Sequence, residues 1–291
     1  MLRCLILMFS QAGATAKVAG AIANGLCAEG YEIDVQNLRD RQPVNTDGYD
    51  LIGVGAPTYY YRPPFNMIDA VKKLPDLEGR PAFVFVIHGS YRGDAGTWLR
   101  RALAQKHAKE VGYFPCRGAD YFLGYLRQGY LFSPESPTPD DLARAAAFGR
   151  AVVARVRGES VTVAGLSESP DPPATFLNRL ERSLVNRWVV RQIATRLFHV
   201  NENLCSCCDR CVRQCPTGTI TRDERGRLVW GRDCLLCLFC EMNCPREAIT
   251  SPLSWRIFRP FLWGNVRHAA RDAALDHVRI THEKGETRRI D

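Results

Sequence analysis

The sequence lacks any hydrophobic run long enough to cross a membrane, although 46% of its 291 residues are hydrophobic. A membrane-spanning helix requires roughly 18 consecutive apolar residues, and no stretch of the chain approaches that length. The apolar start, residues 1–9, leads into a glycine-bearing loop and not into the small-residue cleavage pattern of an export signal. We therefore expect a first buried strand here, and a protein of the reducing cytoplasm.

Two ligand-recognition signatures are absent as well. No G-x-G-x-x-G run follows a predicted strand, which argues against direct use of a nicotinamide cofactor. No nucleic-acid-reading motif accompanies the basic residues, so we expect no nucleic-acid partner. The net charge of +8 is carried mostly by arginine, and the excess lies in residues 151–291. That distribution favours a redox partner protein with an acidic surface, and an anionic membrane surface to a lesser degree.

Cysteine, in contrast, is abundant: the chain has 12, and eight of them form two copies of one spacing. The run from Cys205 to Pro216 reads C-x2-C-x2-C-x3-C-P, and the run from Cys234 to Pro245 repeats it. Bacterial ferredoxins with two [4Fe–4S] clusters have this spacing, and in them the fourth cysteine of each run ligates the other cluster. This rule predicts two crossed ligand sets, which are Cys205, Cys208, Cys211 and Cys244 for one cluster, and Cys215, Cys234, Cys237 and Cys240 for the other.

Other uses of these cysteines fit less well. A zinc ribbon needs four ligands in paired C-x2-C knuckles, and a disulfide framework needs an oxidising compartment. Cys207 lies off the spacing and is expected to be a spare thiol beside the first cluster loop. The isolated Cys4, Cys27 and Cys116 stand in apolar stretches, so we expect them in the core.

The first half of the chain alternates β-rich apolar runs with helical ones. Strands are predicted over residues 2–9, 31–37, 50–55, 82–88 and 111–117, and helices over residues 15–29, 64–74, 94–110 and 140–157. Five short strands with helices between them predict an α/β fold, a doubly wound parallel sheet covered on both faces. Ligands of such folds bind at the carboxyl ends of the strands, where the strand order reverses.

Three loops occupy that edge of the predicted sheet. Residues 10–15 (S-Q-A-G-A-T) place a glycine and two hydroxyls at a helix N-terminus, which suits a phosphate group; a plain helix cap would explain them equally. Residues 56–64 carry three tyrosines, whose flat faces suit a planar ring unless they pack on the sheet. Residues 88–95 (H-G-S-Y-R-G-D-A) add small residues and one more aromatic. Their placement on successive strands predicts one binding site.

On these loops residues 1–157 resemble a flavodoxin. With the cysteine motifs and the stretch 114–141, residues 1–251 resemble the prokaryotic family in which a flavodoxin-like domain is fused to a two-cluster ferredoxin. The resemblance implies strand order 2-1-3-4-5 and noncovalently bound FMN. It implies a phosphate site at Ser10, Gln11, Gly13, Ala14 and Thr15. It also implies that the ring is flanked by Pro57, Thr58, Tyr59, Tyr60 and Tyr61, and by Gly89, Ser90, Tyr91, Gly93 and Asp94.

One position departs from the flavodoxin pattern. Ala12 stands where the usual phosphate loop has a second hydroxyl. Its absence removes a charge-assisted hydrogen bond worth about 1–3 kcal/mol.

The pattern predicts four segments. These are a flavodoxin-like FMN-binding domain (1–157), a Pro-rich linker and amphipathic helix (158–200), a small α+β ferredoxin-type domain (201–251), and a basic, aromatic C-terminal tail (252–291). Residues 176–199 are predicted to form one helix with an apolar side and an arginine-rich side. Such a helix docks on its own domain or lies on a membrane surface. We expect docking against the edge of the flavodoxin sheet, which would bring one cluster near the flavin.

A flavin and two clusters in one chain predict an electron-transfer protein, which passes electrons between the clusters and FMN and on to a redox partner. One alternative is a flavin-dependent oxidoreductase with its own small-molecule substrate, as in a protoporphyrinogen-oxidising family that this sequence distantly resembles. His88 would then donate a proton, and Tyr91 and Arg92 would bind an acidic substrate. A second alternative is a redox sensor that acts through its basic segments, which the missing DNA-reading motif disfavours.

Overall fold

The computed structural model describes residues 2–161, 171, 182–183, 185–273 and 275–290. The chain forms two compact units. The first contains Met1–Ala119 and Glu135–Arg179, and the second contains Asp120–Pro134 and Leu180–Asp291. The predicted four segments treat the chain as consecutive pieces, whereas residues 120–134 leave the first unit and join the second.

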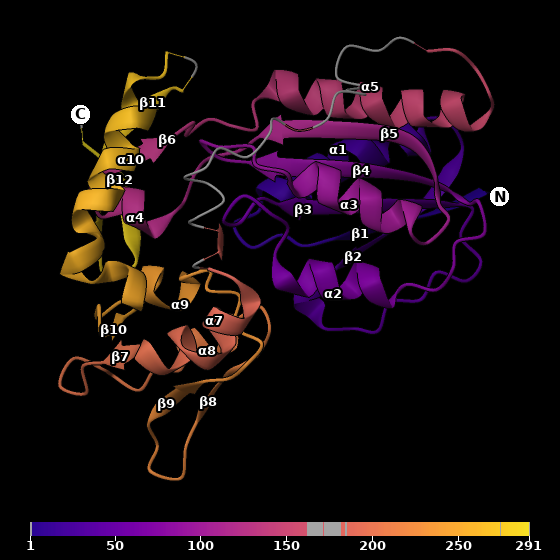
Figure 1. The fold of residues 1–291 in the computed structure, drawn as a ribbon. Helices are drawn as coiled ribbons and strands as arrows, with labels where there is room; N and C mark the ends of the chain where they lie inside the picture. Colours follow the sequence, from indigo (N-terminus) through magenta and orange to yellow (C-terminus); the bar gives the residue numbers. More distant parts are fainter. Residues whose placement is uncertain (1, 162–170, 172–181, 184, 274, 291) are drawn as a thin grey trace. The chain divides into compact units, whose positions relative to one another are not determined.

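A five-stranded parallel sheet forms the centre of the first unit (Figure 1). The sheet has the order β2-β1-β3-β4-β5, which confirms the predicted order 2-1-3-4-5 and the flavodoxin-like fold. Strands β3 and β4 are buried along nearly their whole length, because helices cover both faces of the sheet. The strands are β1 (Leu2–Met8), β2 (Tyr31–Asn37), β3 (Leu51–Pro57), β4 (Pro81–His88) and β5 (Lys109–Arg117).

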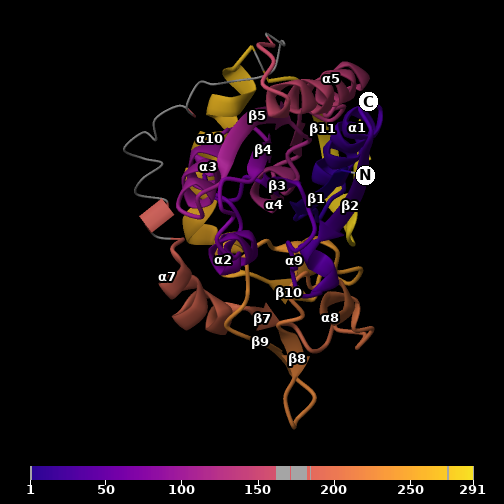
Figure 2. The same cartoon turned by 90° about the vertical axis from the view of Figure 1, so that its right-hand side faces the viewer.

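Two helices cover each face of this sheet, as a view along the strands shows (Figure 2). One face carries α1 (Ala14–Cys27) and α5 (Pro139–Val156), and the other carries α2 (Phe65–Lys73) and α3 (Ala95–Ala104). The helix predicted over residues 94–110 is therefore too long, because β5 already begins at Lys109.

The α1/α5 pair packs unusually closely. A methyl group on Gly25 of α1 would lie 2.0 Å from the carbonyl oxygen of Ala146 in α5, so no larger residue fits there. α5 begins with a capping box, in which Thr138 and Asp141 exchange hydrogen bonds of 3.1 and 2.9 Å with each other's backbone N–H groups. Together these features fix the helix layer that covers β1, whose carboxyl end carries the first candidate loop.

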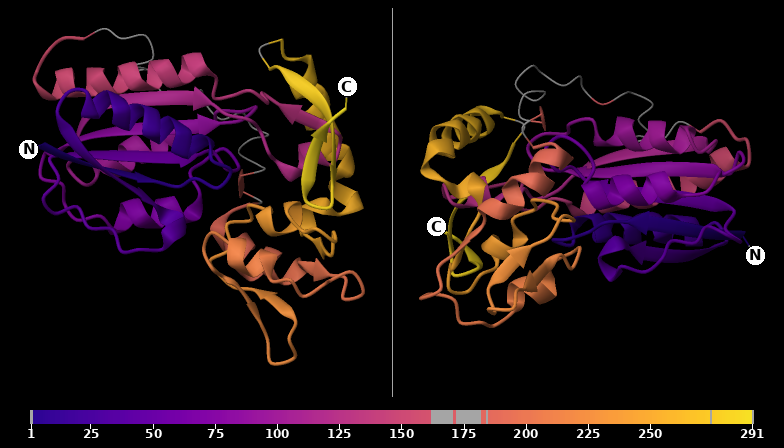
Figure 3. Two further views of the ribbon diagram at one scale, coloured as in Figure 1. Left: turned by 180° about the vertical axis from the view of Figure 1, so that it is seen from behind. Right: turned by 60° about the horizontal axis from the view of Figure 1, so that its bottom comes forward.

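The second unit is built from short elements around the two cysteine runs. β7 (His199–Val200) pairs with β10 (Ile249–Thr250), and β8 (Ile220–Arg222) pairs with β9 (Leu228–Trp230), both antiparallel. The hairpin of β8 and β9 projects from the cysteine-rich part (Figure 3). The short helices α8 (Arg210–Gln214) and α9 (Phe239–Met242) follow the first and second cysteine loops.

The predicted C-terminal tail is a folded part of the second unit. α10 (Arg259–Arg271) follows two 3-10 turns, η3 (Pro252–Ser254) and η4 (Arg256–Phe258), and precedes the hairpin of β11 (His277–Glu283) and β12 (Glu286–Arg289). β11 also pairs with β6 (Tyr130–Phe132), which follows the short α4 (Leu123–Leu126), so residues 120–134 complete a three-stranded sheet. Val266 and Ala269 of α10 pack against Phe132 in the core of this part.

The single helix expected over residues 176–199 is not formed in the part of that range that the structure describes. α7 covers only Arg187–Gln192, and the 3-10 turn η2 (Ala194–Leu197) follows it. The chain turns at Ile193, and the Thr195 hydroxyl donates to the Arg191 carbonyl oxygen at 3.1 Å, a contact that competes with regular helix. Trp188, an aromatic residue on the side of this segment that was expected to dock, is 64% exposed, so it is not buried against a partner surface in the structure. No helix in the described part of the chain is long and apolar enough to span a bilayer.

Candidate functional sites

The three loops at the carboxyl edge of the sheet contact one another. The Tyr59 hydroxyl donates to Gln11 Oε1 at 2.6 Å, which joins the first loop to the second. The Thr58 hydroxyl donates to the Arg92 carbonyl oxygen at 3.1 Å, and the Asp94 N–H donates to the Tyr61 carbonyl oxygen at 2.9 Å. The structure thus gathers the predicted phosphate and ring residues into one place, while their roles toward a ligand remain predictions.

The first loop has the form of a phosphate-binding turn. Its backbone enters α1 through Gly13, whose φ of 95° lies in the left-handed region. The hydroxyl of Ser10 accepts the N–H of Ala16 at 3.1 Å, which leaves its own hydrogen available to a ligand. Asn37, at the end of β2, pins the backbone of Ser10 through two hydrogen bonds of 3.2 and 3.3 Å. Sequence reasoning did not single out Asn37, because its partner is 27 residues away.

The second loop stores backbone strain at two tyrosines. Tyr60 and Tyr61 have φ values of 48° and 64°, a conformation that favours glycine or asparagine. Tyr59 and Arg62 close this tight turn with hydrogen bonds of 2.8 and 3.1 Å. Such conformations cost about 1–3 kcal/mol each and concentrate at ligand-binding sites. The turn presents aromatic side chains at the strand end, beside Tyr91, whose ring lies 6.0 Å from that of Tyr61.

Gly93 is where the second and third loops touch most closely. It has a φ of 63°, and a methyl group there would lie 2.6 Å from the backbone of Tyr61. We expect Gly93→Ala to lower the free energy of unfolding by about 1–3 kcal/mol and to weaken flavin binding, because the loops must separate. Gly79→Ala is the matched control, since Gly79 has a φ of 80° with nothing within 4 Å. Equal effects of the two changes on flavin titration would contradict this role of Gly93.

Arg92 of the third loop is bound to a buried carboxylate. Its guanidinium lies 2.9 Å from Asp171 Oδ1, and the Asp171 side chain is only 1% exposed. Asp171 also accepts the Tyr113 hydroxyl at 2.6 Å and the Thr97 N–H, in the first turn of α3, at 2.7 Å. Because Arg92 is paired within the protein, the structure disfavours the alternative in which it binds an acidic substrate. Asp171 lies in the predicted linker, and nothing in the sequence pattern marked it.

His88, at the end of β4, is held as a neutral imidazole. Burial lowers the pKa of His88 to about 4, and the nearby Arg117 and Arg92 act in the same direction. Its Nδ1–H donates to the Gly89 carbonyl oxygen at 2.9 Å, which fixes the tautomer. A neutral imidazole does not serve as a general acid near pH 7, so the structure disfavours the predicted proton-donor role.

This low pKa has a consequence for stability. The unfolded chain binds a proton at His88 below about pH 6.5, and the folded chain does so only below about pH 4. Stability is therefore lost as the pH falls between these values, by about 2 kcal/mol from about pH 7.5 to about pH 5. Urea unfolding at the two pH values should show this loss of stability in the native protein and not in His88→Gln. His107→Gln, at an exposed histidine, should retain it.

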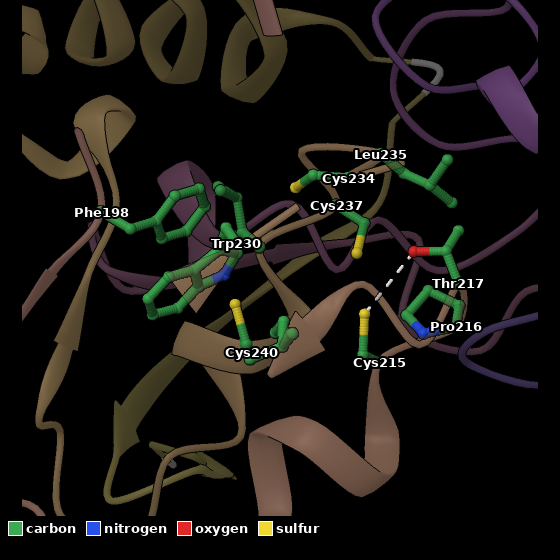
Figure 4. Close-up of a pocket in the computed structure, with 11 residues that line it drawn as sticks. Phe198, Cys215, Pro216, Thr217, Trp230, Cys234, Leu235, Cys237 and Cys240 are labelled. Carbon is green, nitrogen blue, oxygen red and sulfur yellow. Dashed lines mark hydrogen bonds between the residues drawn. The ribbon is translucent and has the colours of Figure 1, made fainter. Parts of the chain in front are cut away.

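The eight motif cysteines line two separate cavities. One cavity is lined by Cys215, Cys234, Cys237 and Cys240, and Figure 4 shows their four sulfurs facing a common space. The other is lined by Cys205, Cys208, Cys211 and Cys244. Each cavity thus takes three cysteines from one run and the fourth from the other, which is the crossed arrangement that the spacing predicts.

Burial keeps several of these thiols protonated. It raises the pKa of Cys234 to about 12 and that of Cys211 to about 11, and it raises the pKa of Cys240 well above its usual value. Thiolates are the form that binds metal, so metal loading has to release protons from these groups.

Two aromatic residues beside the first cavity were not predicted from the sequence. Phe198 and Trp230 stack with ring centroids 4.6 Å apart and planes within 8° (Figure 4). The buried indole N–H of Trp230 makes no hydrogen bond within the described part of the chain, but it lies near enough to Cys240 to lower the pKa of that thiol. A sulfur-rich ligand in this cavity would satisfy it.

The cysteines do not form disulfides. All twelve are free, and all lie in the described part of the chain. Among the described residues, no group of three or more His, Cys, Asp or Glu side chains is arranged to hold a metal ion. Of the isolated cysteines, Cys4 and Cys116 are buried as expected, whereas Cys27 is exposed at the end of α1.

Comparison with known proteins agrees with this fold. Residues 5–125 match the family model described as "Flavodoxin domain", so the first unit is a flavodoxin-like domain; the match covers less than half of the chain and ends before the cysteine runs. The chain is similar to a solved flavodoxin from the domain Archaea (19% identity, TM-score 0.43, 54% of this chain and 99% of that one). It is similar to oxidised flavodoxin 1 from Bacillus cereus (21% identity, TM-score 0.42, 52% of this chain and 97% of that one). It is also similar to rubredoxin oxygen:oxidoreductase from Desulfovibrio gigas (14% identity, TM-score 0.43, 54% of this chain and 36% of that one). No curated protein matches the chain.

Proposed function

We propose that this protein transfers electrons between FMN in the flavodoxin-like unit and two [4Fe–4S] clusters in the second unit, and onward to a redox partner with an acidic surface. The observation that carries the proposal is the pair of cavities, each lined by one crossed set of four cysteines. FMN exchanges two electrons or one, and each cluster exchanges one, so the combination links two-electron to one-electron chemistry.

The donor set suits [4Fe–4S] clusters. Each cavity offers four cysteine sulfurs and no histidine, which is the ligand chemistry of such clusters. We assign Cys205, Cys208, Cys211 and Cys244 to one cluster and Cys215, Cys234, Cys237 and Cys240 to the other.

The loops of the first unit suit FMN. Ser10 and Thr15 are buried beside the N-terminus of α1, where a phosphate is stabilised by helix N–H groups. The strained tyrosine turn and Tyr91 offer aromatic faces for the ring. The missing hydroxyl at Ala12 is expected to weaken phosphate binding relative to a loop that has it.

An oxidoreductase with its own substrate is less well supported. Two of the three residues that would have bound or protonated a substrate are committed elsewhere, since Arg92 pairs with Asp171 and His88 is neutral.

Anaerobic purification followed by assay of iron, acid-labile sulfide and flavin tests the proposal. We expect about eight irons, about eight sulfides and one flavin per chain after reconstitution. Markedly less iron, or no flavin, would refute it.

A further inference from the structure

The two cysteine cavities differ in their chemistry. The cavity of Cys215, Cys234, Cys237 and Cys240 has no charged side chain among its lining residues. Its loop reads C-L-L-C-L-F-C, and the three leucines, Leu235, Leu236 and Leu238, are at most 4% exposed. We call this the apolar cavity.

The other cavity is basic. Its loop reads C-S-C-C-D-R-C, and Arg210, Arg222 and Arg246 line it. Asp209 is the only acidic lining residue, and it is paired with Arg222 at 2.6 Å. Among the lining residues, positive charges therefore outnumber negative ones by two. Cys208 of this cavity is exposed, whereas Cys234 of the apolar cavity is buried.

Charge and solvent both act on the reduction potential of a cluster. Reduction by one electron adds one negative charge to the cluster and its thiolates. Nearby cations and water stabilise that added charge and raise the potential, whereas apolar burial lowers it. Building on the proposed function, we propose that the cluster in the basic cavity has the higher reduction potential and takes the first electron, while the cluster in the apolar cavity has the lower one.

Hydrogen bonds to the sulfurs do not reverse this order. Each cavity has a backbone donor of similar length, from Leu236 to Cys234 at 3.4 Å and from Ala248 to Cys244 at 3.3 Å. The Trp230 N–H and the Thr217 hydroxyl, 3.6 Å from Cys215 Sγ, favour reduction in the apolar cavity. Both are neutral dipoles, whereas the lining of the basic cavity carries two excess positive charges and a more exposed cysteine.

Two acidic residues just outside the apolar cavity are paired. Glu241, next to Cys240, is buried and lies 2.6 Å from Arg127. Asp233, next to Cys234, pairs with Arg191 at 3.3 Å. Neither pair adds a net positive charge that would raise the potential of that cluster.

Because the two cysteine runs repeat one pattern, a charged residue of one run can be exchanged with the neutral residue at the same position of the other. Cys244-Pro245-Arg246 in the second run corresponds to Cys215-Pro216-Thr217 in the first. Arg246 lines the basic cavity, and Thr217 lines the apolar one, with its hydroxyl 3.6 Å from Cys215 Sγ. Arg246→Thr therefore removes a charge from one cavity, and Thr217→Arg adds one to the other.

The test is an anaerobic redox titration of the reconstituted full chain with dithionite, followed by electron paramagnetic resonance. We expect two cluster midpoints. Arg246→Thr should lower the upper midpoint by about 59 mV, a tenfold change in the one-electron reduction equilibrium, and leave the lower one in place. Thr217→Arg should raise the lower midpoint. Arg225→Thr, at an exposed position that lines neither cavity, should move neither.

Two results would overturn the assignment: midpoints that coincide in the native protein, or an Arg246→Thr shift in the lower midpoint. Neither affects the proposed function, which fails only if the chain lacks iron, sulfide or flavin. Iron assays on each variant distinguish the two cases, because a shifted potential counts only in a chain that holds both clusters.

Discussion

Replacing Cys237 with serine is expected to reduce the iron content from about eight to about four atoms per chain, because one cluster loses a ligand. The second unit is made of short elements, and its cysteine-rich part cannot bury enough apolar surface to be stable without metal. Loss of the cluster should therefore expose this part to protease, while flavin content stays unchanged. Iron and sulfide assays with limited proteolysis, under anaerobic conditions, measure both effects.

Cys207→Ser is the control for this change. Cys207 lies inside the first cysteine run but lines neither cavity. The variant should keep both clusters and its resistance to protease. A full iron content in Cys237→Ser, or a loss of iron in Cys207→Ser, would contradict the ligand assignment.

Asp171→Ala should lower the free energy of unfolding of the first unit by about 3–5 kcal/mol, because it leaves the Arg92 guanidinium without its buried partner. The same change removes the acceptor for the Tyr113 hydroxyl and for the N–H of Thr97. We expect the third loop to loosen and flavin affinity to fall with it. Urea unfolding of the flavin-free chain and flavin titration measure the two effects separately.

Asp140→Ala serves as the matched control. Asp140 is 84% exposed and lies 3.5 Å from Arg144, so its removal should change stability by less than about 1 kcal/mol. Asp171→Asn keeps an acceptor for the Thr97 N–H. Its loss of unfolding free energy should therefore lie between those of Asp140→Ala and Asp171→Ala. Similar effects at positions 140 and 171 would show that the Arg92–Asp171 pair does not hold the third loop.

The sheet was predictable because its signal is local and strong. Buried parallel strands read as apolar runs, as β4 does over Pro81–His88, and the loops that follow them then fall at one edge by topology alone. Helix ends and the helix over 176–199 were less predictable. Apolar and basic residues recur there with helical spacing, but the break at Ile193 depends on local contacts that this spacing does not encode.

The candidate sites divide in the same way. The cluster cysteines follow from their spacing, since four ligands must reach one cluster from nearby loops. Asp171 could not be found, because it contacts Thr97 across 74 residues and lies in a segment rich in proline and serine. The difference between the leucine-rich and the arginine-containing cysteine loop, in turn, was visible in the sequence. The structure adds that these side chains surround two separate cavities, one apolar and one basic.

Because residues 120–134 belong to the second unit, the chain crosses between the two units three times. The chain passes from the first unit to the second after Ala119, returns after Pro134, and crosses again after Arg179. Three chain connections therefore join the two units, whereas two domains fused in tandem are joined by one. A single cut in the linker would leave two tethers, and β6 would still be paired with β11.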